Sequence, residues 1–303
     1  MNDIVKRDKN KFRVQYSATT KESFANNLIG VMLRVLPDFK GSWLIYRHII
    51  HLFPKKLRTT RLEVSKNGKP LLAVDFDILD PPQFTMVKKR RYDLGTALTI
   101  YSLLRESDTF FDVGANSGYI SAVAAQKVGD SGLVVSIEPN KEAFHSLLER
   151  KLSNSVALNH VCSDVSGKSF QLKKAFYRQT TSSYFVEGEG VSSITLDAVY
   201  NQLNKPSVRL VKVDAEGAEL QIVKGARQLL AERDPYVIIE AEEDHAERYG
   251  YSLMDLKRFM NEMGYSKYYF IDDSKAFVES LEDIKEGQIL FSKEALTSHS
   301  FSL

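Results

Sequence analysis

Acidic residues, one lysine and one histidine recur at or just after short apolar runs that have the composition of buried strands. They are Asp112, Glu138, Lys212, Asp214, Glu216, Glu240 and His245. A carboxylate or an imidazole in such a place can accept a proton or orient a reacting hydroxyl, and a lysine can neutralise negative charge that develops beside it. The pattern predicts acid–base chemistry at one edge of a sheet, where the ends of parallel strands meet.

A glycine-rich turn follows the first of these runs, with the sequence Asp112-Val113-Gly114-Ala115-Asn116-Ser117-Gly118. Glycines between a strand and a helix let a ligand approach the backbone closely. The dinucleotide pattern G-x-G-x-x-G is missing, because Asn116 stands where its second glycine would be, and this argues against a nicotinamide dehydrogenase. Asp112 would repel a pyrophosphate but suits a cationic amino-acid head group. The turn therefore predicts S-adenosylmethionine, which carries an ammonium and a sulfonium and no phosphate.

Two further acids are placed to complete such a site. Glu138 comes 20 residues after Gly118, at the end of the second strand, where a carboxylate can accept hydrogen bonds from both ribose hydroxyls. Asp164, in Cys162-Ser163-Asp164 after the third strand, is placed to meet an adenine amino group. Acids after strands are common by themselves, and Asp164 could instead form a turn or a cap before Gly167.

Lys212 and Asp214 share one face of the fourth strand because side chains alternate along a strand, and Glu216 lies just beyond. A lysine inside a central parallel strand is costly unless it is paired or used. Asp214 could be the base or could orient the acceptor, while Lys212 could neutralise a forming alkoxide or hold Asp214. The alternative is a buried ion pair that only sets the local structure.

Glu240 ends the fifth strand and is expected at the same site, followed by the acidic stretch that leads to His245. Imidazoles titrate near neutral pH, so His245 is a candidate base, although a histidine in an acidic loop can simply be solvated. Asp214, Glu240 and His245 could together hold Mg²⁺, but their spacing is not diagnostic and we expect no metal. Glu219 is expected to be structural, in the first turn of the next helix.

Short apolar runs alternate with helical segments from residue 92 onward. The expected strands are Thr109–Val113, Leu133–Glu138, Ser155–Val161, Val208–Val213, Tyr236–Glu240, Lys267–Asp272 and Gln288–Phe291, and the expected helices are Ser117–Val128, Lys141–Lys151, Ala218–Ala231 and Ser252–Met263. This alternation predicts an α/β fold in which helices wrap a mostly parallel sheet. Residues 167–206 interrupt the rhythm with an expected strand pair and a short helix, which we interpret as an insertion in a domain of residues 92–303.

Residues 1–91 are predicted to be a basic N-terminal extension, with 19 Lys and Arg against 8 Asp and Glu, whereas residues 92–303 hold 22 against 31. Two helices are expected within residues 21–53 and short strands within residues 61–87, with a hairpin turn at Asn67-Gly68. The simplest interpretation is a basic region that docks on the acidic body. It could also cap the substrate, contact a second subunit in a homodimer, or make peripheral contact with a membrane surface.

The glycine-rich turn, Ile137-Glu138-Pro139-Asn140 and Val211-Lys212-Val213-Asp214-Ala215-Glu216-Gly217-Ala218-Glu219 together resemble the FkbM-type methyltransferases, as do Ser193–Asp197, Val223–Ala226 and Ile238–Glu240. The resemblance covers roughly residues 92–272. It implies a Rossmann-like class I methyltransferase fold, with a mostly parallel seven-stranded sheet and helices on both faces, and usually O-methylation. The residues then expected at the cofactor are Asp112, Gly114, Ala115, Asn116, Gly118, Glu138, Pro139, Ser163, Asp164 and Asp214.

We therefore expect an enzyme that methylates a hydroxyl of a small molecule, a sugar or a glycan; an N-methyltransferase or a non-catalytic module that keeps the fold for protein interaction is the alternative. Asp214-Ala215-Glu216-Gly217 after the fourth strand, in place of an Asp-Pro-Pro-aromatic motif, favours oxygen over nitrogen as the acceptor. Nucleic acid is not an expected partner, because Lys88–Arg91 lacks interleaved aromatics. The single cysteine and the absence of a long apolar stretch favour a cytoplasmic protein.

Overall fold

The computed structural model describes residues 12–18, 51–52, 59–66, 69–77, 93–177, 180–272 and 277–297. The chain divides into two compact units. The larger unit holds the described residues within Thr96–Asp272 and Phe277–Leu303, and the smaller holds those within Arg7–Gly95. The helices expected within residues 21–53 lie outside the described residues, apart from residues 51 and 52.

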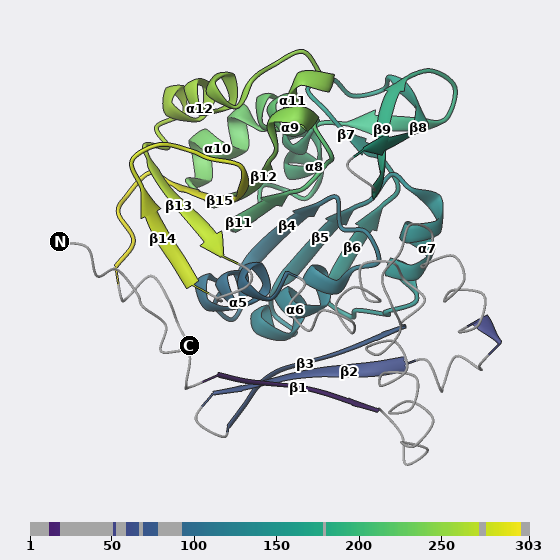
Figure 1. Ribbon diagram of the computed structural model, residues 1–303, viewed down its shortest axis with the longest axis vertical. Helices are drawn as coiled ribbons and strands as arrows, with labels where there is room; N and C mark the ends of the chain where they lie inside the picture. Colours follow the sequence, from purple (N-terminus) through teal and green to yellow (C-terminus); the bar gives the residue numbers. More distant parts are fainter. Residues whose placement is uncertain are drawn as a thin grey trace. The chain divides into compact units, whose positions relative to one another are not determined.

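The smaller unit contains an antiparallel sheet in the order β1-β2-β3 (Figure 1). The strands are β1 (Phe12–Ala18), β2 (Thr59–Lys66) and β3 (Lys69–Asp77). Strands β2 and β3 flank residues 67 and 68, so the predicted hairpin is confirmed, whereas β1 was not predicted. Val64 pairs with Leu72 in the register, and both are buried. On the opposite face Arg61 Nε donates to Asp75 Oδ1 at 2.6 Å, which is the in–out alternation expected of a strand.

The larger unit is built on an eight-stranded sheet in the order β14-β13-β15-β12-β11-β4-β5-β6 (Figure 1). Its strands are β4 (Thr109–Val113), β5 (Leu133–Ile137), β6 (Ser155–Leu158), β11 (Val208–Val213), β12 (Tyr236–Ala241), β13 (Lys267–Asp272), β14 (Phe277–Leu281) and β15 (Gly287–Ser292). Strands β12, β11, β4, β5 and β6 are parallel, and the other three join antiparallel. The predicted α/β fold with a mostly parallel sheet is confirmed. The sheet has eight strands and not seven because β14 adds an antiparallel edge next to β13.

Helices cover both faces of this sheet (Figure 1). They are α5 (Leu94–Leu103), α6 (Tyr119–Val128), α7 (Lys141–Leu148), α8 (Leu196–Gln202), α9 (Glu219–Lys224), α10 (Arg227–Arg233), α11 (Glu243–Arg248) and α12 (Leu253–Glu262). Phe111 and Val113 of β4 face the core cluster that α8, α9, α10 and α12 supply. Asp112 faces the opposite way, toward α6. The central strands are mostly apolar because both of their faces are covered, and Asp112 and Lys212 are exceptions near their carboxyl ends.

A second, four-stranded sheet in the order β7-β10-β8-β9 joins three strands of the expected insertion to β7, which precedes it. Its strands are β7 (Val161–Cys162), β8 (Ser169–Tyr177), β9 (Thr180–Glu187) and β10 (Val191–Ile194). Strands β8 and β9 are the predicted pair, and α8 is the predicted short helix. The prediction of one strand over Ser155–Val161 was wrong, because β6 ends at Leu158 and Val161 pairs with Ser193 of β10 in the other sheet.

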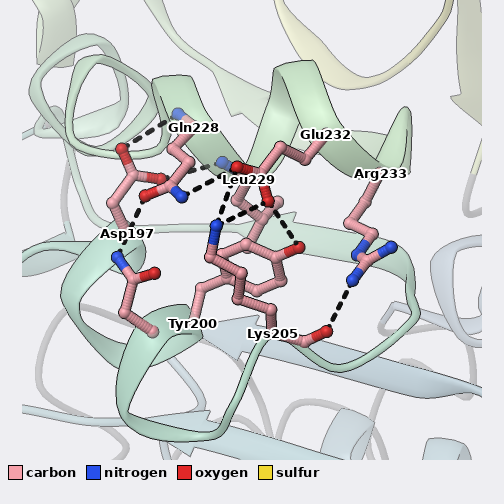
Figure 2. A network of polar contacts seen from close by, with 8 residues as sticks. Asp197, Tyr200, Lys205, Gln228, Leu229, Glu232 and Arg233 are labelled. Atoms are coloured by element: carbon pink, nitrogen blue, oxygen red, sulfur yellow. Dashed lines mark hydrogen bonds and ion pairs between the residues drawn. The ribbon is translucent and has the colours of Figure 1, made fainter.

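The segment predicted as one helix over Ala218–Ala231 is two helices, α9 and α10, that meet at Gly225-Ala226. The N-terminus of α10 is capped from α8: Asp197 accepts hydrogen bonds from Gln228 N at 3.0 Å and from Leu229 N at 2.9 Å (Figure 2). In the same network Glu232 accepts from Tyr200 Oη at 3.1 Å. A carboxylate on the free N–H groups of a first helical turn replaces the partners that the helix itself lacks.

Candidate active site

The carboxyl ends of four neighbouring parallel strands bring most of the predicted residues to one edge of the central sheet. Lys212 of β11 is in register with Asp112 of β4 on one side and with Ile238 of β12 on the other. Glu138 follows β5 directly and Glu240 lies at the end of β12. Ligands of open α/β sheets bind outside this edge, so the predicted position of the site agrees with the topology.

The loop after β4 has a backbone conformation that its glycines make accessible. Gly114 has φ +76°, and a Cβ there would lie 1.7 Å from the carbonyl oxygen of Asp214. The amide N–H groups of Gly114 and Ala115 both donate to the carbonyl of Ile137, at 2.9 and 3.2 Å. Asn116 follows in the left-handed region at φ +49°. The loop is thereby held against both neighbouring strand ends, with its backbone uncovered by side chains at Gly114.

Gly118 ends the loop and begins α6, also with positive φ, +78°. A Cβ on Gly118 would lie 2.4 Å from Leu147 Cδ1, which belongs to α7. Arg150, just beyond α7, donates from Nε to the carbonyl oxygen of Ser117. The second glycine of the motif is therefore required by the close packing of the segment after β5 against the loop, in addition to the turn itself.

Asp112 is completely buried, and only one of its carboxylate oxygens has a partner among the described residues. Oδ2 accepts from Ser121 Oγ at 2.6 Å, and Ser121 in turn accepts from Ser136 Oγ at 2.8 Å. Oδ1 is buried without a hydrogen-bond partner in that part of the chain. Burial raises the pKa of Asp112 above its usual value, although the charge of Lys212 opposes this. A buried acceptor without a donor is suited to a cationic, hydrogen-bonding ligand group, as the predicted cofactor has.

Glu138 is buried, and backbone N–H groups fix both of its oxygens. Oε2 accepts from Asn116 N and Oε1 from Asn140 N, each at 2.7 Å. Burial raises the pKa of Glu138 to about 7, even though these two hydrogen bonds favour the charged form. Each carboxylate oxygen keeps a second lone pair. The carboxyl group is therefore held in place and can still accept from a pair of hydroxyls, as predicted for a ribose.

Pro139 lies between Glu138 and the N-cap residue of α7, Asn140, whose side chain accepts from the backbone of Glu142 and Ala143. Asn159 Nδ2 donates to the carbonyl oxygens of Glu138, at 2.8 Å, and Pro139, at 3.1 Å. These contacts hold the segment that presents Glu138. Asn159, just after β6, was not predicted, because an asparagine after a strand is indistinguishable from a turn residue in the sequence.

Ser163 and Asp164 follow β7, not a strand of the central sheet as predicted. Asp164 is exposed, and Ser163 Oγ donates to its Oδ1 at 3.2 Å. The backbone at Ser163 is approached closely by Gly225, where a Cβ would lie 2.2 Å from the Ser163 carbonyl oxygen. This close approach requires a glycine at position 225, where α9 ends. The role of Asp164 toward an adenine stays a prediction.

Lys212, Asp214 and Glu240 form one hydrogen-bonded group. Lys212 is buried, and its Nζ donates to Asp214 Oδ2 at 2.8 Å. The carboxyl groups of Asp214 and Glu240 also hydrogen-bond to each other. A hydrogen bond between two carboxyl groups needs a proton on one of them. The structure thus brings these three residues together, while their role in a site stays a prediction.

The shared proton resides on Glu240. The negative charge of Asp214 and burial raise the pKa of Glu240 well above its usual value. Burial alone would raise the pKa of Asp214, but the charge of Lys212 and the hydrogen bond with Glu240 outweigh it, so the pKa of Asp214 is lowered. The negative charge of the pair is therefore favoured on Asp214, and one quarter of the Asp214 side-chain surface is exposed to solvent.

Glu216 and His245 form a second pair on the solvent side of the group. His245 Nε2 lies 3.6 Å from Glu216 Oε2, and 41% of the Glu216 side chain is exposed. Burial and the negative charges of Asp214 and Glu219 raise the pKa of Glu216 to about 7. Glu216 also has φ +54°, which is strained for a residue other than glycine. His245 lies in α11 and not in the predicted loop.

Glu219 has the structural role that was predicted. It is buried, and its Oε1 accepts from the backbone N–H groups of Ala215 and Gly217 at 3.0 and 3.1 Å. Its Oε2 accepts from Tyr251 Oη at 2.9 Å. These bonds close the turn between β11 and α9, and so position Glu216. Both oxygens of the Glu219 carboxylate therefore bind groups of the protein.

Gly217, in the same turn, has φ +118°, and a Cβ there would lie 2.5 Å from the carbonyl oxygen of His245. Helix α11 therefore packs directly on the turn. It also supplies Arg248, which was not predicted, because the acidic stretch that leads to His245 was expected to be a loop. The three-residue spacing of His245 and Arg248, which places them on one helical face, was the available signal.

No group of three or more His, Cys, Asp or Glu side chains that could hold a metal ion is found among the described residues. Within the same ranges, no helix is long and apolar enough to cross a membrane.

Residues 112–267 match the protein family described as Methyltransferase FkbM domain. The match extends over more than half of the 303 residues. It begins at Asp112 and includes every strand-end acid described above, together with His245 and Arg248. The smaller unit lies outside it.

Two curated proteins are similar to parts of the chain. The chain is 29% identical over 139 residues to hexuronic acid methyltransferase AglP of Haloferax volcanii, which is 45% of this chain and 56% of that protein. It is 33% identical over 78 residues to the ribosomal RNA large subunit methyltransferase E of Methanobrevibacter smithii, which is 22% of this chain and 37% of that protein. The chain thus spans about half or less of the length of these relatives.

Among solved structures, the methyltransferase FkbM from Methylobacillus flagellatus is similar at a TM-score of 0.43 and 16% identity, covering 88% of this chain and 58% of that one. A SAM-dependent methyltransferase from Aquifex aeolicus is similar at a TM-score of 0.40 and 16% identity, covering 71% and 94% of the two chains.

Proposed function

This chain belongs to the methyltransferase FkbM family, and from that premise we propose that it transfers a methyl group from S-adenosylmethionine to a hydroxyl oxygen of a sugar, a glycan or another small molecule. The observation that carries the proposal is the carboxylate group beside the glycine loop: Glu216, with its pKa of about 7, next to the paired Asp214 and Glu240. A hydroxyl acceptor needs a group that takes its proton. The similarity to a hexuronic acid methyltransferase supports a sugar as the acceptor.

S-adenosylmethionine is the cofactor of this family, as predicted from the loop. Asp112 would hold its cationic end and Glu138 its ribose, with Gly114 and Asn116 supplying backbone between them. The buried, unpartnered Oδ1 of Asp112 and the fixed carboxyl of Glu138 fit these two roles. When bound, the cofactor supplies a methyl group on a sulfonium, an electrophile that needs no further activation.

Glu216 is the proton acceptor that we propose. A general base works best when its pKa is near the working pH, because it is then ionised and still basic, and such a base contributes roughly 10²–10⁴ in rate. The raised pKa of Glu216 meets this condition, and its side chain is accessible. His245, 3.6 Å away, can pass the proton onward. Asp214 is a weaker base, because its pKa is lowered and its charge is already engaged.

Asp214 would instead orient the acceptor hydroxyl through the part of its carboxylate that remains exposed. Lys212 and protonated Glu240 hold that carboxylate at the end of β11. The positive charge of Lys212 also offsets the negative charge of Asp214. A nearby acceptor hydroxyl can therefore lose its proton against less electrostatic repulsion. Precise placement of the acceptor can itself supply roughly 7–11 kcal/mol in favourable intramolecular models.

Calorimetry of the full chain with S-adenosylmethionine and, separately, with NAD tests the cofactor. We expect binding of the first and none of the second. Asp112→Asn should weaken binding at least about tenfold if Oδ1 meets a cation, which is about 1.4 kcal/mol. No binding of S-adenosylmethionine by folded protein would exclude the proposed activity and favour an interaction module.

Transfer of labelled methyl to panels of sugars, free amines and ribosomal RNA tests the acceptor. We expect label on a sugar hydroxyl and a kcat/KM that falls below about pH 7 as Glu216 becomes protonated. Glu216→Gln should remove that acid limb and reduce kcat by roughly 10²-fold or more. Asp214→Asn should lower turnover with little effect on cofactor affinity. Label on amines or RNA alone, or an unchanged acid limb in Glu216→Gln, contradicts the proposal.

A further inference from the structure

Arg248, the last residue of α11, carries a guanidinium that has no hydrogen-bond acceptor among the described residues. The residue is half-buried, and its Nη1 is buried without a partner there. Its carbon Cζ lies 4.9 Å from the centre of the Tyr184 ring on β9. The stacking supports the plane of the guanidinium but satisfies none of its five N–H donors. A desolvated donor without an acceptor is unfavourable, so this arrangement is suited to a ligand that supplies one.

The surroundings hold Arg248 in place. Tyr249 Oη accepts a hydrogen bond from Phe185 N at 3.1 Å and donates one to the Phe185 carbonyl oxygen at 3.2 Å. These two bonds connect the end of α11 to β9, next to Tyr184. The turn after β11 approaches the same helix through Gly217, where a Cβ would come within 2.7 Å of the Tyr249 ring. The backbone that carries Arg248 is therefore anchored on two sides, and the Tyr184 ring limits the freedom of its guanidinium before a ligand binds.

The charges around Arg248 place it beside the proposed reaction site. Glu216 is near enough for the Arg248 charge to oppose the rise in its pKa. Glu216 in turn lies 3.6 Å from His245, one helical turn before Arg248. No ion pair between Arg248 and a carboxylate is found within the described ranges. The guanidinium is thus close enough to Glu216 for its charge to act there, and no described carboxylate forms an ion pair with it.

We propose that Arg248 binds an anionic group of the methyl acceptor, a carboxylate such as that of a uronic acid or a phosphate ester, and thereby selects acidic over neutral sugars. The planar guanidinium matches carboxylate and phosphate oxygens in a two-pronged hydrogen bond, and the neighbouring Tyr184 ring keeps its plane fixed. Arg248 is then a specificity-determining residue, and Glu216 still accepts the proton. This inference rests on the proposed function for its acceptor site, but its binding test does not require turnover.

The test compares three sugars that differ in charge: methyl β-D-glucuronide, glucose 6-phosphate and neutral methyl β-D-glucoside. Binding is measured by calorimetry on the full chain with S-adenosylhomocysteine present, and transfer with labelled S-adenosylmethionine. We expect at least one anionic sugar to bind about tenfold or more tightly than the glucoside. Whichever anionic sugar binds more tightly shows whether Arg248 binds a carboxylate or a phosphate. Arg248→Gln should remove most of that preference. Arg258→Gln, which removes a 70% exposed guanidinium paired with Asp255, should keep it.

The inference is overturned if the wild-type chain binds charged and neutral sugars equally, or binds no anionic sugar. It is also overturned if folded Arg248→Gln keeps the preference for the anionic sugar. If Arg248→Gln does not fold, Arg248→Lys decides, because it keeps the charge but loses the two-pronged geometry. Its KM or Kd for the preferred anion should rise about threefold or more, and an unchanged value overturns the inference. A chain that prefers anions through Arg248 but transfers no methyl would contradict the proposed function alone.

Discussion

The ammonium Nζ of Lys212, in β11, donates a hydrogen bond across 2.8 Å to Oδ2 of Asp214, the residue directly after that strand. The charge of Lys212 also favours ionisation of Asp112, on the adjacent strand, and of Glu240. One buried cation therefore acts on three carboxyl groups that belong to three neighbouring strands. Lys212 thus acts both on Asp112, proposed to bind the cofactor, and on Asp214 and Glu240, near the proposed acceptor. The charge balance of the site therefore depends on Lys212.

Lys212→Met is expected to destabilise the protein strongly. Without the cation, Asp214 keeps a desolvated negative charge or must take up a proton, and the loss of one partner of a buried pair costs about 3–5 kcal/mol. Urea unfolding of the cofactor-free chain measures this. Lys205→Met is the matched control, because its ion pair with Glu232 is exposed and worth about 0–1 kcal/mol. Equal costs for both substitutions would show that the Lys212 pair is not the buried centre described above.

Gly114→Ala is expected to prevent the loop from closing on β11. Its Cβ would overlap the Asp214 carbonyl, 1.7 Å away, at a φ of +76° that L-residues rarely adopt. Backbone cannot give way as a side chain can, so we expect a loss of about 4 kcal/mol or more. Gly167→Ala is the control: it has φ +84° but no atom within 4 Å of the added Cβ, and should cost only about 1–2 kcal/mol. Similar unfolding free energies for the two variants would argue against the close approach.

The stability of the cofactor-free protein is expected to fall as the pH rises from about 4.5 to about 7. Burial raises the folded-state pKa of Glu138 and Glu216 to about 7, from an ordinary value of 4.5. The folded state therefore holds more protons than the unfolded state in this range, and the free energy of unfolding decreases with pH. Glu138 alone would account for about 3 kcal/mol.

Glu216 contributes less than Glu138, because its side chain is 41% exposed and solvent screens its charge. Urea unfolding at pH 5 and pH 7.5 measures the difference, and Glu216→Gln should reduce it slightly. Carboxyl groups with lowered pKa values, such as Asp255 and Asp283, change charge at lower pH and do not mask the effect. A free energy of unfolding that increases across this range would contradict the raised pKa values.

Asp197→Ala is expected to cost about 1–2 kcal/mol, because it leaves two N–H groups at the start of α10 without their acceptor. Asn201→Ala provides the control in the same network: it removes only an exposed hydrogen bond to Gln228, at 3.0 Å, and should cost less than about 0.5 kcal/mol. Thermal unfolding in the absence of cofactor compares them. If Asp197→Ala were as mild as Asn201→Ala, the cap between the two helices would not be an energetic contact.

The sequence by itself determined most of the strands of the central sheet and which acidic residues lie at their ends. Runs such as Thr109–Val113 and Val208–Val213 are apolar because both faces of a parallel strand are covered, so they were recognisable locally, and the acids after them were placed at one edge. The glycines at positions 114 and 118 were recognisable for the same reason, since a strand-to-helix turn of this kind requires them. The family followed from these motifs in order.

Only the tertiary structure decided how those residues divide their roles. The pKa values of Glu216, Asp214 and Glu240 depend on burial and on charges brought from different strands, which no local pattern contains. Helix α11 is short and acidic, so its sequence resembled a loop; packing on Gly217 and the tie between Tyr249 and Phe185 make it a helix that presents Arg248. Likewise β7 is not part of the central sheet: polar Asn159 and His160 separate it from β6, and its partner is the distant strand β10.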